Sequence, residues 1–309
     1  MLQGSCLGPF LYVAYANELN NMLPGIEIVT YADDIALCVS GDDLDSLTVK
    51  MNEGLEVVFN WSCFNLLPIN FEKCHALVIT NRTGNDAATL KIGNHTIPIK
   101  LTTNYLGIHI DSKLTFSHHL SSVNTRLSQL VGITWKLTYR LNICTAKSLY
   151  FSFVYSLISY GIAAWGGVFM TMSCTRTFSL HRRIVMNLFS WHFPGVDFVG
   201  ICSRLGFLLP TDIYRINLMT FYYNNTRSQH LPPLRFMDSQ SSYDFRVTTT
   251  LVVPFPRTLV VKSHFSYQIP MVWNSIPETI KNEPFVSKFK VAYKRFLLDR
   301  MLIGSVGLR

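Results

Sequence analysis

Charged residues are scarce in this chain. Asp, Glu, Lys and Arg make up 15% of its 309 residues, whereas hydrophobic residues make up 49% and the mean hydropathy is +0.23. Intrinsically disordered chains combine low hydrophobicity with high net charge, so this composition excludes disorder as the main state. The length leaves room for a sizeable hydrophobic core and predicts about two domains.

Cysteine pairs at metal-binding spacing are also absent. The seven Cys are an odd number, and no two of them form a Cys-x-x-Cys pattern, which excludes a disulfide framework and a zinc finger. Most lie among hydrophobic residues, as Cys38 does, so we expect buried, reduced thiols in an intracellular protein. The neighbouring His118 and His119 would point about 100° apart on a helix and would be poor joint metal ligands.

Residues 1–5 carry no charged side chain, so we expect no signal peptide. A long uncharged run does occur at residues 148–175, and its 28 residues are enough to span a bilayer. Within it, four hydrophobic residues recur at helical spacing and form one amphipathic face: Phe151, Val154, Tyr155 and Ile158. This pattern favours a buried helix followed by a turn, with a membrane span as the alternative.

The net charge of +8 is divided unevenly along the chain. Residues 1–111 hold twelve acidic and five basic residues, a balance of −7, and residues 112–309 hold seven acidic and twenty-two basic residues, a balance of +15. An acidic front and a basic rear suggest a cation site beside a polyanion. The alternative is that the excess of basic residues serves only solubility.

The front of the chain alternates helix and strand patterns. We expect a helix over residues 7–23, which ends at Pro24-Gly25, and then a hairpin of strands 26–31 and 35–39. Asp42, Asp43 and Asp45 predict the capped start of a further helix. Shorter strand-like runs follow at 76–80, 90–92, 97–99 and 105–110.

The rear of the chain is mainly helical by pattern. Helices are expected at 117–141, 145–160, 174–190, 211–224 and 285–302. Residues 229–243 look like a linker or a long loop. The β-branched runs 248–253 and 258–261 suggest strands. These patterns predict an α+β fold.

Asp33 and Asp34 lie between the two strands of the expected hairpin. Paired Asp at a hairpin tip often only marks a turn, because Asp tolerates the backbone angles that turns need. The functional interpretation is a magnesium site, since Mg²⁺ takes one or two carboxylates and completes its shell with water and phosphate oxygens. Two such ions about 4 Å apart support phosphoryl transfer.

Four motifs follow one another around this pair. They are Gln3-Gly4-Ser5-Cys6-Leu7-Gly8-Pro9, Tyr31-Ala32-Asp33-Asp34, residues 66–73 and residues 104–111. In order and spacing they resemble blocks B, C, D and E of reverse transcriptases, and the first two are similar to those of non-LTR (LINE-type) retrotransposon polymerases. Residues 114–119, 160–166 and 270–277 also resemble stretches of that family, so the resemblance covers nearly the whole chain.

The resemblance implies roles for the catalytic residues. Asp33 and Asp34 would bind the catalytic ions, Mg²⁺ or Mn²⁺. Lys73 corresponds to the lysine that protonates the pyrophosphate leaving group, as an ammonium beside a triphosphate can. The alternative for Lys73 is a solvated turn residue.

Further residues would bind nucleic acid according to the same resemblance. Gln3 and Gly4 would line the pocket for template and incoming nucleotide. Tyr31 would contact primer or template near the site, or else pack in the core. Leu106 and Gly107 would form the primer grip, where a Gly lets a nucleic-acid strand approach the backbone.

The implied architecture has three parts. Residues 1–112 would form a partial polymerase palm, an antiparallel sheet with helices. Residues 113–224 would form a mainly helical thumb that follows the phosphates of a hybrid duplex. Residues 225–309 would form a mixed C-terminal region, in which the Trp273-Asn274 box has no chemistry that we can derive.

The implied function is that of an RNA-directed DNA polymerase fragment. Its partners would be an RNA template, a DNA primer and deoxynucleoside triphosphates, without a membrane, inside the cell as a ribonucleoprotein of the nucleus or cytoplasm. The family's strand with a further metal-binding Asp lies upstream of Gln3, so we expect a truncated product, or a gene model that starts at an internal Met, that is inactive alone. The alternative is a noncatalytic RNA- or DNA-binding remnant that uses the basic rear half.

Overall fold

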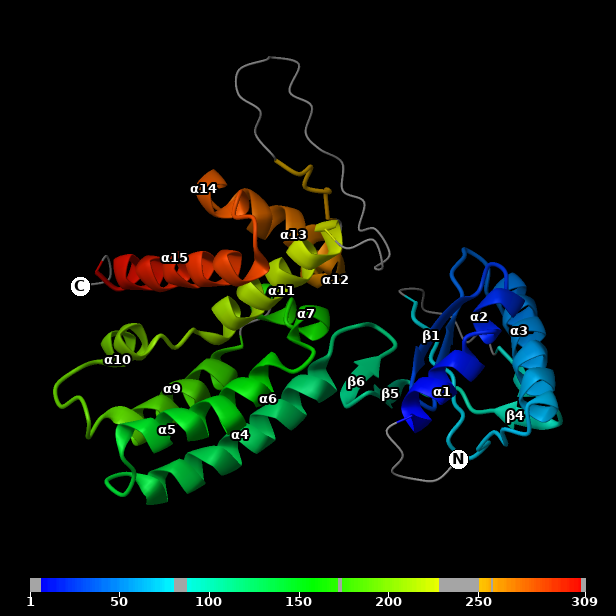
Figure 1. The fold of residues 1–309 in the computed structure, drawn as a ribbon, viewed down its shortest axis with the longest axis horizontal. Coiled ribbons are helices and arrows are strands. Elements are labelled where there is room, and N and C mark those ends of the chain that lie inside the picture. The colour runs from blue at the N-terminus through cyan, green and yellow to red at the C-terminus, as the bar shows by residue number, and fades with distance from the viewer. Residues whose placement is uncertain (1–6, 81–87, 172–173, 228–249, 257, 307–309) are drawn as a thin grey trace, which may run out of the picture. The chain divides into compact units, whose positions relative to one another are not determined.

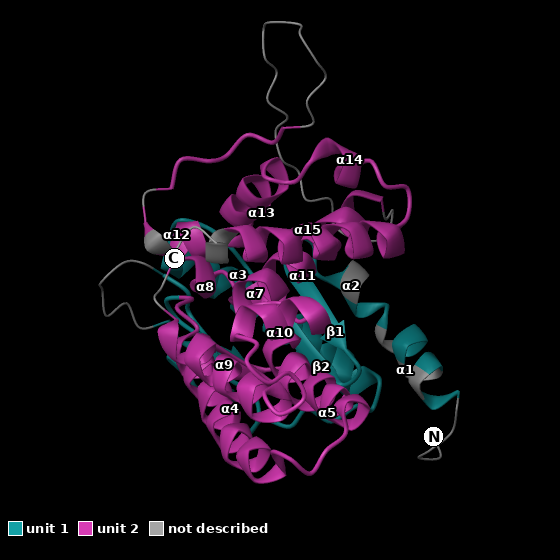
Figure 2. Cartoon of the chain, turned by 90° about the vertical axis from the view of Figure 1, so that its left-hand side faces the viewer, with its two compact units in different colours: residues 1–103, 111–113 teal, residues 104–110, 114–309 magenta. Residues whose placement is uncertain are grey.

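The computed structural model describes the chain except residues 1–6, 81–87, 172–173, 228–249, 257 and 307–309 (Figure 1). The chain forms two compact units, which Figure 2 distinguishes by colour. Unit 1 comprises residues 1–103 and 111–113, and unit 2 comprises residues 104–110 and 114–309. Helices dominate and the sheets are small, so the α+β prediction is confirmed. The parts named palm and thumb stay a prediction.

Unit 1 consists of helices and short hairpins. Its elements are α1 (Gly8–Ala16), α2 (Leu19–Met22), β1 (Glu27–Tyr31), β2 (Asp34–Cys38), α3 (Leu44–Phe64), β3 (Leu90–Ile92) and β4 (His95–Ile97). β1 pairs antiparallel with β2, and β3 with β4. A third two-stranded sheet, β5 (Thr102–Tyr105) with β6 (Ile108–Asp111), lies where the chain passes between the units.

The longest helix of unit 1 begins where its acidic residues predict. The Asp43 carboxylate caps α3 by accepting a hydrogen bond of 2.9 Å from the Ser46 backbone N–H. Leu55, Val58 and Trp61 of α3 are buried in two small hydrophobic clusters.

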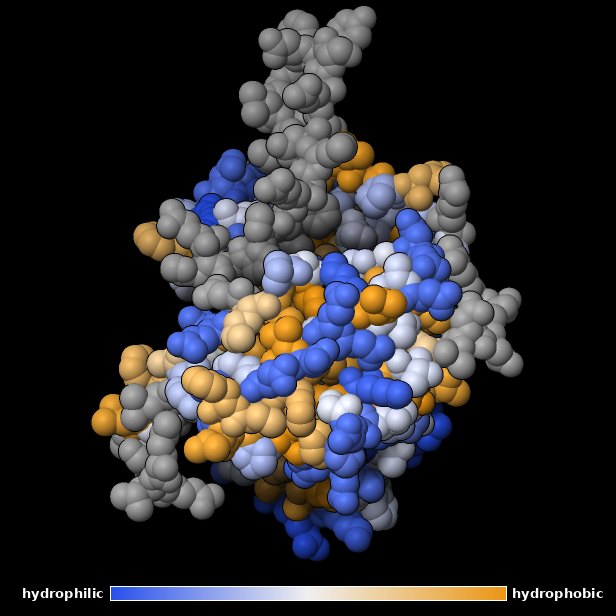
Figure 3. Space-filling model, turned by 90° about the vertical axis from the view of Figure 1, so that its right-hand side faces the viewer, coloured by the Kyte–Doolittle hydropathy of each residue, from blue (hydrophilic) through white to orange (hydrophobic). Residues whose placement is uncertain are grey.

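Many large hydrophobic side chains of unit 1 are nevertheless exposed. Figure 3 shows hydrophobic side chains in orange among blue hydrophilic ones on one face of the molecule. The exposed residues of unit 1 include Leu7, Phe10, Val13, Val29, Phe64 and Leu66.

Unit 2 is a bundle of helices. Its elements are α4 (Ser117–Leu137), α5 (Ile143–Leu149), the π-helix η1 (Tyr150–Tyr155), α6 (Ser156–Ser159), α7 (Ile162–Trp165), α8 (Val168–Thr171), α9 (Thr175–Phe189), α10 (Phe198–Leu205), α11 (Pro210–Arg227), α12 (Leu259–Ser263), α13 (Phe265–Asn274), α14 (Glu278–Lys281) and α15 (Val286–Val306). α4 and α9 lie side by side (Figures 1 and 2). One continuous core joins these helices, with Trp165, Tyr150 and Tyr214 among its fully buried side chains.

The described residues of the uncharged run, 148–171 and 174–175, contribute to this core. Val154 and Ile158 are fully buried, as expected, but Phe151 is 40% exposed and Tyr150 takes its place inside. Among the described residues no single helix is long and apolar enough to cross a membrane, while one pair bent by 47°, residues 143–159 and 162–171, passes by length and composition.

Several local predictions are wrong. Residues 258–261 fall in helix α12, because the Thr258 hydroxyl accepts a hydrogen bond from the Val261 N–H and caps a helix start. Residues 76–80 contribute only a single bridge, from Ala76 to Ile99. Residues 105–110 do not form a single strand, because they contain the turn of the β5–β6 hairpin. The expected linker 229–243 lies outside the described residues.

The cysteines that the structure describes are free, but fewer of them are buried than predicted. Of the six that the structure describes, only Cys174 and Cys202 are buried. Cys38, Cys63 and Cys144 are exposed. Hydrophobic neighbours in sequence did not bury Cys38, because successive strand residues point to opposite faces of the sheet.

Candidate functional site

The β1–β2 hairpin presents the two adjacent carboxylates. Tyr31 pairs with Asp34 in the register, so Ala32 and Asp33 form a two-residue turn. Ala32 has φ 50°, in the left-handed region, which makes this a tight reversal. Asp33 and Asp34 are exposed, and Tyr31 is 64% exposed. The structure thus places Tyr31 on the surface beside the carboxylates and not in the core.

Lys73 lies in a turn that shares its packing with this hairpin. Ile69, shortly before the turn, packs in the same hydrophobic cluster as Ile28 and Ile35 of the hairpin strands. The turn is closed by a hydrogen bond from the Lys73 N–H to the Asn70 carbonyl, and the Lys73 side chain is exposed. The motif at residues 31–34 and the motif at residues 66–73 are therefore supported by the same small hydrophobic cluster. Gln3 and Gly4 lie outside the described residues.

The carboxylates suit a hard divalent cation in their chemistry. Mg²⁺ accepts one or two carboxylate ligands and fills its remaining positions with water and phosphate oxygens, and exposed Asp side chains leave room for both. Within the described part of the chain, no group of three or more His, Cys, Asp or Glu could hold a metal ion together. Among the described residues, the hairpin therefore offers two carboxylates without a third metal-ligating side chain beside them.

The turn between β5 and β6 carries Leu106 and Gly107. Both have positive φ, 48° and 80°, as the turn of a two-residue hairpin requires. The Tyr160 hydroxyl donates a hydrogen bond of 2.7 Å to the Leu106 carbonyl. Gly161, with φ 57°, allows Ile108 to approach, since a Cβ there would lie 2.3 Å from Ile108 Cδ1. The chain therefore fixes this turn against the end of α6.

A groove of about 700 Å³ opens beside this turn, within unit 2. One wall is α4, the other is η1 with α6, and the β5–β6 turn forms one end. Its polar lining comes from Asn104, His109, His119, Ser122, Arg126, Gln129, Ser152, Ser156 and Tyr160. The lining contains Arg126 and no carboxylate, which suits a polyanion. The π-helix contributes Ser152 and Phe153, and π-helical turns are common at functional sites.

Two histidines at the groove are held neutral. Burial lowers the pKa of His119 to about 4, and the nearby His109, Arg126 and His118 lower it further. Burial also lowers the pKa of His109, with His118 and Arg126 contributing. The backbone N–H of His109 donates a hydrogen bond of 3.4 Å to His119 Nδ1, which requires that this ring nitrogen be unprotonated. Both rings can thus face a ligand as neutral donors and acceptors at pH 7.

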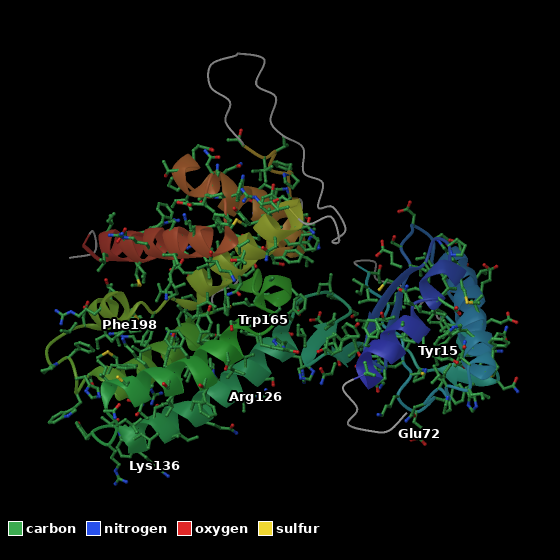
Figure 4. All side chains as sticks on the ribbon, in the orientation of Figure 1. Tyr15, Glu72, Arg126, Lys136, Trp165 and Phe198 are labelled. Carbon is green, nitrogen blue, oxygen red and sulfur yellow. The ribbon has the colours of Figure 1, made fainter. Side chains whose placement is uncertain are left out.

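One charge pattern marks the segment that forms the groove. The charge balance summed over each half of the chain does not reveal it. Between Asp111 and Asp197 the sequence contains no Asp or Glu, but it contains eight Lys or Arg. This segment supplies α4, α5, η1, α6 and α9. Counting charge in windows would have found it. Figure 4 shows two of these side chains, Arg126 and Lys136, along α4.

The Trp273-Asn274 box has a structural explanation. The Asn274 amide donates to the Leu251 carbonyl at 2.8 Å, and the Leu251 N–H donates to Asn274 Oδ1 at 2.9 Å. Trp273 packs against the Tyr222 ring at 5.0 Å, and Lys281 Nζ lies 5.6 Å from its centroid. The Trp273-Asn274 box therefore fixes the backbone near Leu251 to the hydrophobic core of unit 2.

Comparison with known proteins agrees with these features. Residues 1–110 match the family described as reverse transcriptase (RNA-dependent DNA polymerase). The chain is 29% identical over 174 residues to the RNA-directed DNA polymerase from mobile element jockey of Drosophila melanogaster, covering 53% of this chain and 19% of that protein. It is 30% identical over 184 residues to the probable RNA-directed DNA polymerase from transposon BS of the same species, again covering 53% and 19%.

A third relative is the probable RNA-directed DNA polymerase from transposon X-element of Drosophila melanogaster, 24% identical over 180 residues, with 53% of this chain and 19% of that protein covered. The chain thus matches 19% of the length of each of these curated relatives. No solved structure is significantly similar to it.

Proposed function

We propose that this chain belongs with the LINE-type (non-LTR) reverse transcriptases, which it resembles, and that it carries part of the metal site and the duplex-binding groove of an RNA-directed DNA polymerase. The observation that carries the proposal is the Asp33-Asp34 pair, which lies exposed at a hairpin tip inside the residues that match the family. Its substrates are deoxynucleoside triphosphates on an RNA template with a DNA primer, inside the cell in a ribonucleoprotein.

The proposed mechanism is transfer of a nucleotide to a primer hydroxyl: the hydroxyl oxygen bonds to the α-phosphorus of the triphosphate and gives its proton to water, while the bond from that phosphorus to the pyrophosphate oxygen breaks. When bound, Mg²⁺ would neutralise phosphate charge and acidify the attacking hydroxyl. Asp33 and Asp34 would hold it through carboxylate oxygens. Lys73 donates a proton to the pyrophosphate that leaves, a role that its exposed ammonium permits.

The remaining residues position the nucleic acid. Tyr31 presents its exposed ring to primer or template beside the carboxylates. Leu106 and Gly107 hold the primer backbone at the turn that Tyr160 fixes. Gln3 and Gly4, outside the described residues, keep the role in the nucleotide pocket that the family resemblance implies. The groove between α4 and η1–α6 takes the duplex, with Arg126 on its phosphates.

We propose that the chain alone binds a hybrid duplex but does not extend a primer. Two neighbouring carboxylates supply only part of a two-ion site, and the described residues bring no third metal-ligating side chain to them. The second candidate, a noncatalytic nucleic-acid-binding protein, is favoured by the acid-free segment between Asp111 and Asp197.

The test of the groove measures affinity for an RNA–DNA hybrid by fluorescence anisotropy from 50 to 400 mM KCl. We expect Arg126→Gln to weaken binding and to reduce the slope of log Kd against log salt by about 1. Lys290→Ala, an exposed cation on α15, is the matched control and should leave the slope unchanged. Affinity that ignores salt, or equal slopes for both variants, would refute the groove assignment.

The test of the metal site measures Mn²⁺ binding by electron paramagnetic resonance. Asp33→Asn with Asp34→Asn should abolish bound Mn²⁺ and leave hybrid affinity in EDTA unchanged. Bound Mn²⁺ that survives the double substitution contradicts the metal assignment. Template-dependent nucleotide incorporation by the unmodified chain contradicts its inactivity alone.

A further inference from the structure

The far end of α4 carries aromatic rings that the groove does not use. Tyr139, just beyond the helix, is 71% exposed, and Trp191, just beyond α9, is 62% exposed. The two rings meet edge to face, with centroids 4.9 Å apart and planes at 86°. Trp135, in the last turn of α4, is 70% exposed as well. Exposure of several hydrophobic rings to water is unfavourable in free energy, and such patches usually mark an interaction surface.

The backbone here is held in a costly conformation. Tyr139 has φ 71°, in the left-handed region that a bulky side chain rarely adopts. A residue with this φ persists only where its surroundings enforce it, and such residues gather at functional sites. The strained backbone directs a large ring outward, which a Gly at this position would not do.

A network of hydrogen bonds enforces that conformation. The Thr138 hydroxyl donates to the Asn187 carbonyl at 3.0 Å, and the Asn187 amide donates to Thr134 Oγ1 at 3.2 Å. His192 Nε2 lies 3.0 Å from the Leu141 carbonyl. These bonds tie the ends of α4 and α9 together on both sides of the Tyr139–Trp191 pair, so the rings form a preorganised platform.

The charge around the platform is of one sign. Lys136 and Arg140 are exposed on either side of Tyr139 in the sequence. No Asp or Glu occurs between residues 111 and 197, so no carboxylate from this segment compensates them. Exposed aromatic rings flanked by cations are the combination that binds single-stranded nucleic acid, whose unpaired bases stack on the rings while the cations follow the phosphates.

We propose that Tyr139 and Trp191, with Lys136 and Arg140, form a binding platform for single-stranded RNA that is separate from the duplex groove. Bases inside a duplex are already stacked on one another and cannot use such rings. The groove lining on α4 ends at Ile133, which lies about 8 Å along the helix axis from Thr138 at 1.5 Å per residue, so the platform begins just beyond the end of the groove lining. The choice of RNA rests on the proposed function, because an RNA-directed polymerase meets template RNA beyond its duplex.

The experiment compares two labelled ligands by fluorescence anisotropy: a 15-nucleotide oligo(U), which has no internal pairing, and a blunt RNA–DNA hybrid. Tyr139→Gly and Trp191→Ala should each weaken oligo(U) binding about 10-fold and change hybrid affinity less than twofold. Phe255→Ala, at a residue 92% exposed elsewhere in unit 2, is the control and should change neither.

Tyr139→Gly separates binding from folding. Gly accepts φ 71° without strain, so the thermal midpoint should stay or rise while oligo(U) binding falls. A variant that loses both ligands equally, or neither, overturns the proposal. Equal binding of oligo(dT) overturns the choice of RNA, and self-association in sedimentation that these substitutions abolish assigns the surface to a second copy instead.

The failure of this proposal is distinguishable from failure of the proposed function. If Arg126→Gln leaves hybrid binding intact but Tyr139→Gly reduces oligo(U) binding, the groove assignment fails and the platform stands. The reverse pattern refutes the platform alone.

Discussion

The two units of this chain bury hydrophobic surface to very different degrees. Among the described residues, unit 2 has one continuous core of thirty-five buried residues, whereas unit 1 has two clusters of four buried residues each. Unit 1 is also the part in which Phe10, Val13, Phe64 and Leu66 are exposed. A large shared core stabilises a fold by itself, and small separate cores give little stability.

The difference shows on what kind of structure the proposed functional residues lie. The carboxylates and Lys73 lie on turns of the weakly packed unit, and the groove lies on helices anchored in the large core. Exposed turns leave room for a cation and a triphosphate, while a rigid groove holds a long ligand in one register. The predictions below compare the two units, from the largest expected effect to the smallest.

The largest effect is expected at a core tryptophan of unit 2. Trp165 is fully buried, donates from Nε1 to the Tyr160 carbonyl at 2.9 Å and contacts the His119 ring at 4.9 Å. Trp165→Ala should reduce the free energy of unfolding by about 3–5 kcal/mol. Denaturant unfolding with hydrogen exchange on peptides from each unit measures this loss and its location.

The matched substitution in unit 1 is Trp61→Ala. Trp61 is 5% exposed in a four-residue cluster, and its Nε1 has no hydrogen-bond partner among the described residues. Its replacement should cost less, about 1–3 kcal/mol, because a small cluster collapses more easily around the space. An equal loss of unfolding free energy for the two substitutions would contradict the proposed difference in stability between the units.

The next effect concerns pH and unit 2. Burial lowers the pKa of His181 to about 4, and its Nε2 lies 2.9 Å from the Tyr150 hydroxyl. The folded pKa is below the unfolded value of about 6.5, so the stabilisation is complete above pH 6.5 and is lost as pH falls toward 4, at up to about 1.4 kcal/mol per pH unit. Between pH 6.5 and 5 this amounts to about 2 kcal/mol.

His181→Phe isolates that contribution. The variant removes the titrating ring and should flatten the dependence of unfolding free energy on pH below 6.5, whatever its effect at pH 7, where Tyr150 loses a partner. Urea unfolding at pH 7, 6 and 5 gives the slopes. Parallel slopes for the two proteins would mean that His181 does not titrate with unfolding.

The smallest effect compares two helix glycines. A Cβ at Gly132 of α4 would meet nothing within 4 Å, so Gly132→Ala should stabilise unit 2 by about 0.5–1 kcal/mol. A Cβ at Gly54 of α3 would lie 2.3 Å from Ile26 Cδ1. Gly54→Ala should therefore destabilise unit 1, or at best leave it unchanged, and thermal midpoints of opposite shift would confirm the contrast.

The sequence predicted the elements whose patterns are strong. The Asp run at 42–45 located the start of α3, and the alternation around Asp33 located the first hairpin. The valines of α12 led to a wrong prediction of a strand at residues 258–261. The Thr258 cap and the packing of α12 on α8 and α13 outweigh the β-propensity of these valines. Packing between distant elements cannot be read from local composition.

The sequence proposes the residues of the candidate site, and the structure adds their surroundings. Motifs identified Asp33, Lys73 and Gly107, but the bond from Tyr160 to Leu106 joins residues 54 positions apart, which spacing alone does not reveal. The helical face at 151–158 was misjudged for a similar reason. A spacing of 3.6 residues per turn places Phe151 inside, whereas the wider turns of η1 bury Tyr150 and Val154.

That π-helix has a consequence for how the sequence can change in length. A π-helix contains one more residue per turn than the α-helix would, so deletion of one residue within Tyr150–Tyr155 would restore ordinary α-helical hydrogen bonding. Because the extra residue is confined to this stretch, the residues that follow would keep their face of the helix, and the Tyr160 hydroxyl would still reach the Leu106 carbonyl. A deletion within α4, which is regular α-helix, would instead rotate all that follows it by about 100°. The segment Tyr150–Tyr155 is therefore a place where unit 2 can lose a residue without losing the alignment of its groove.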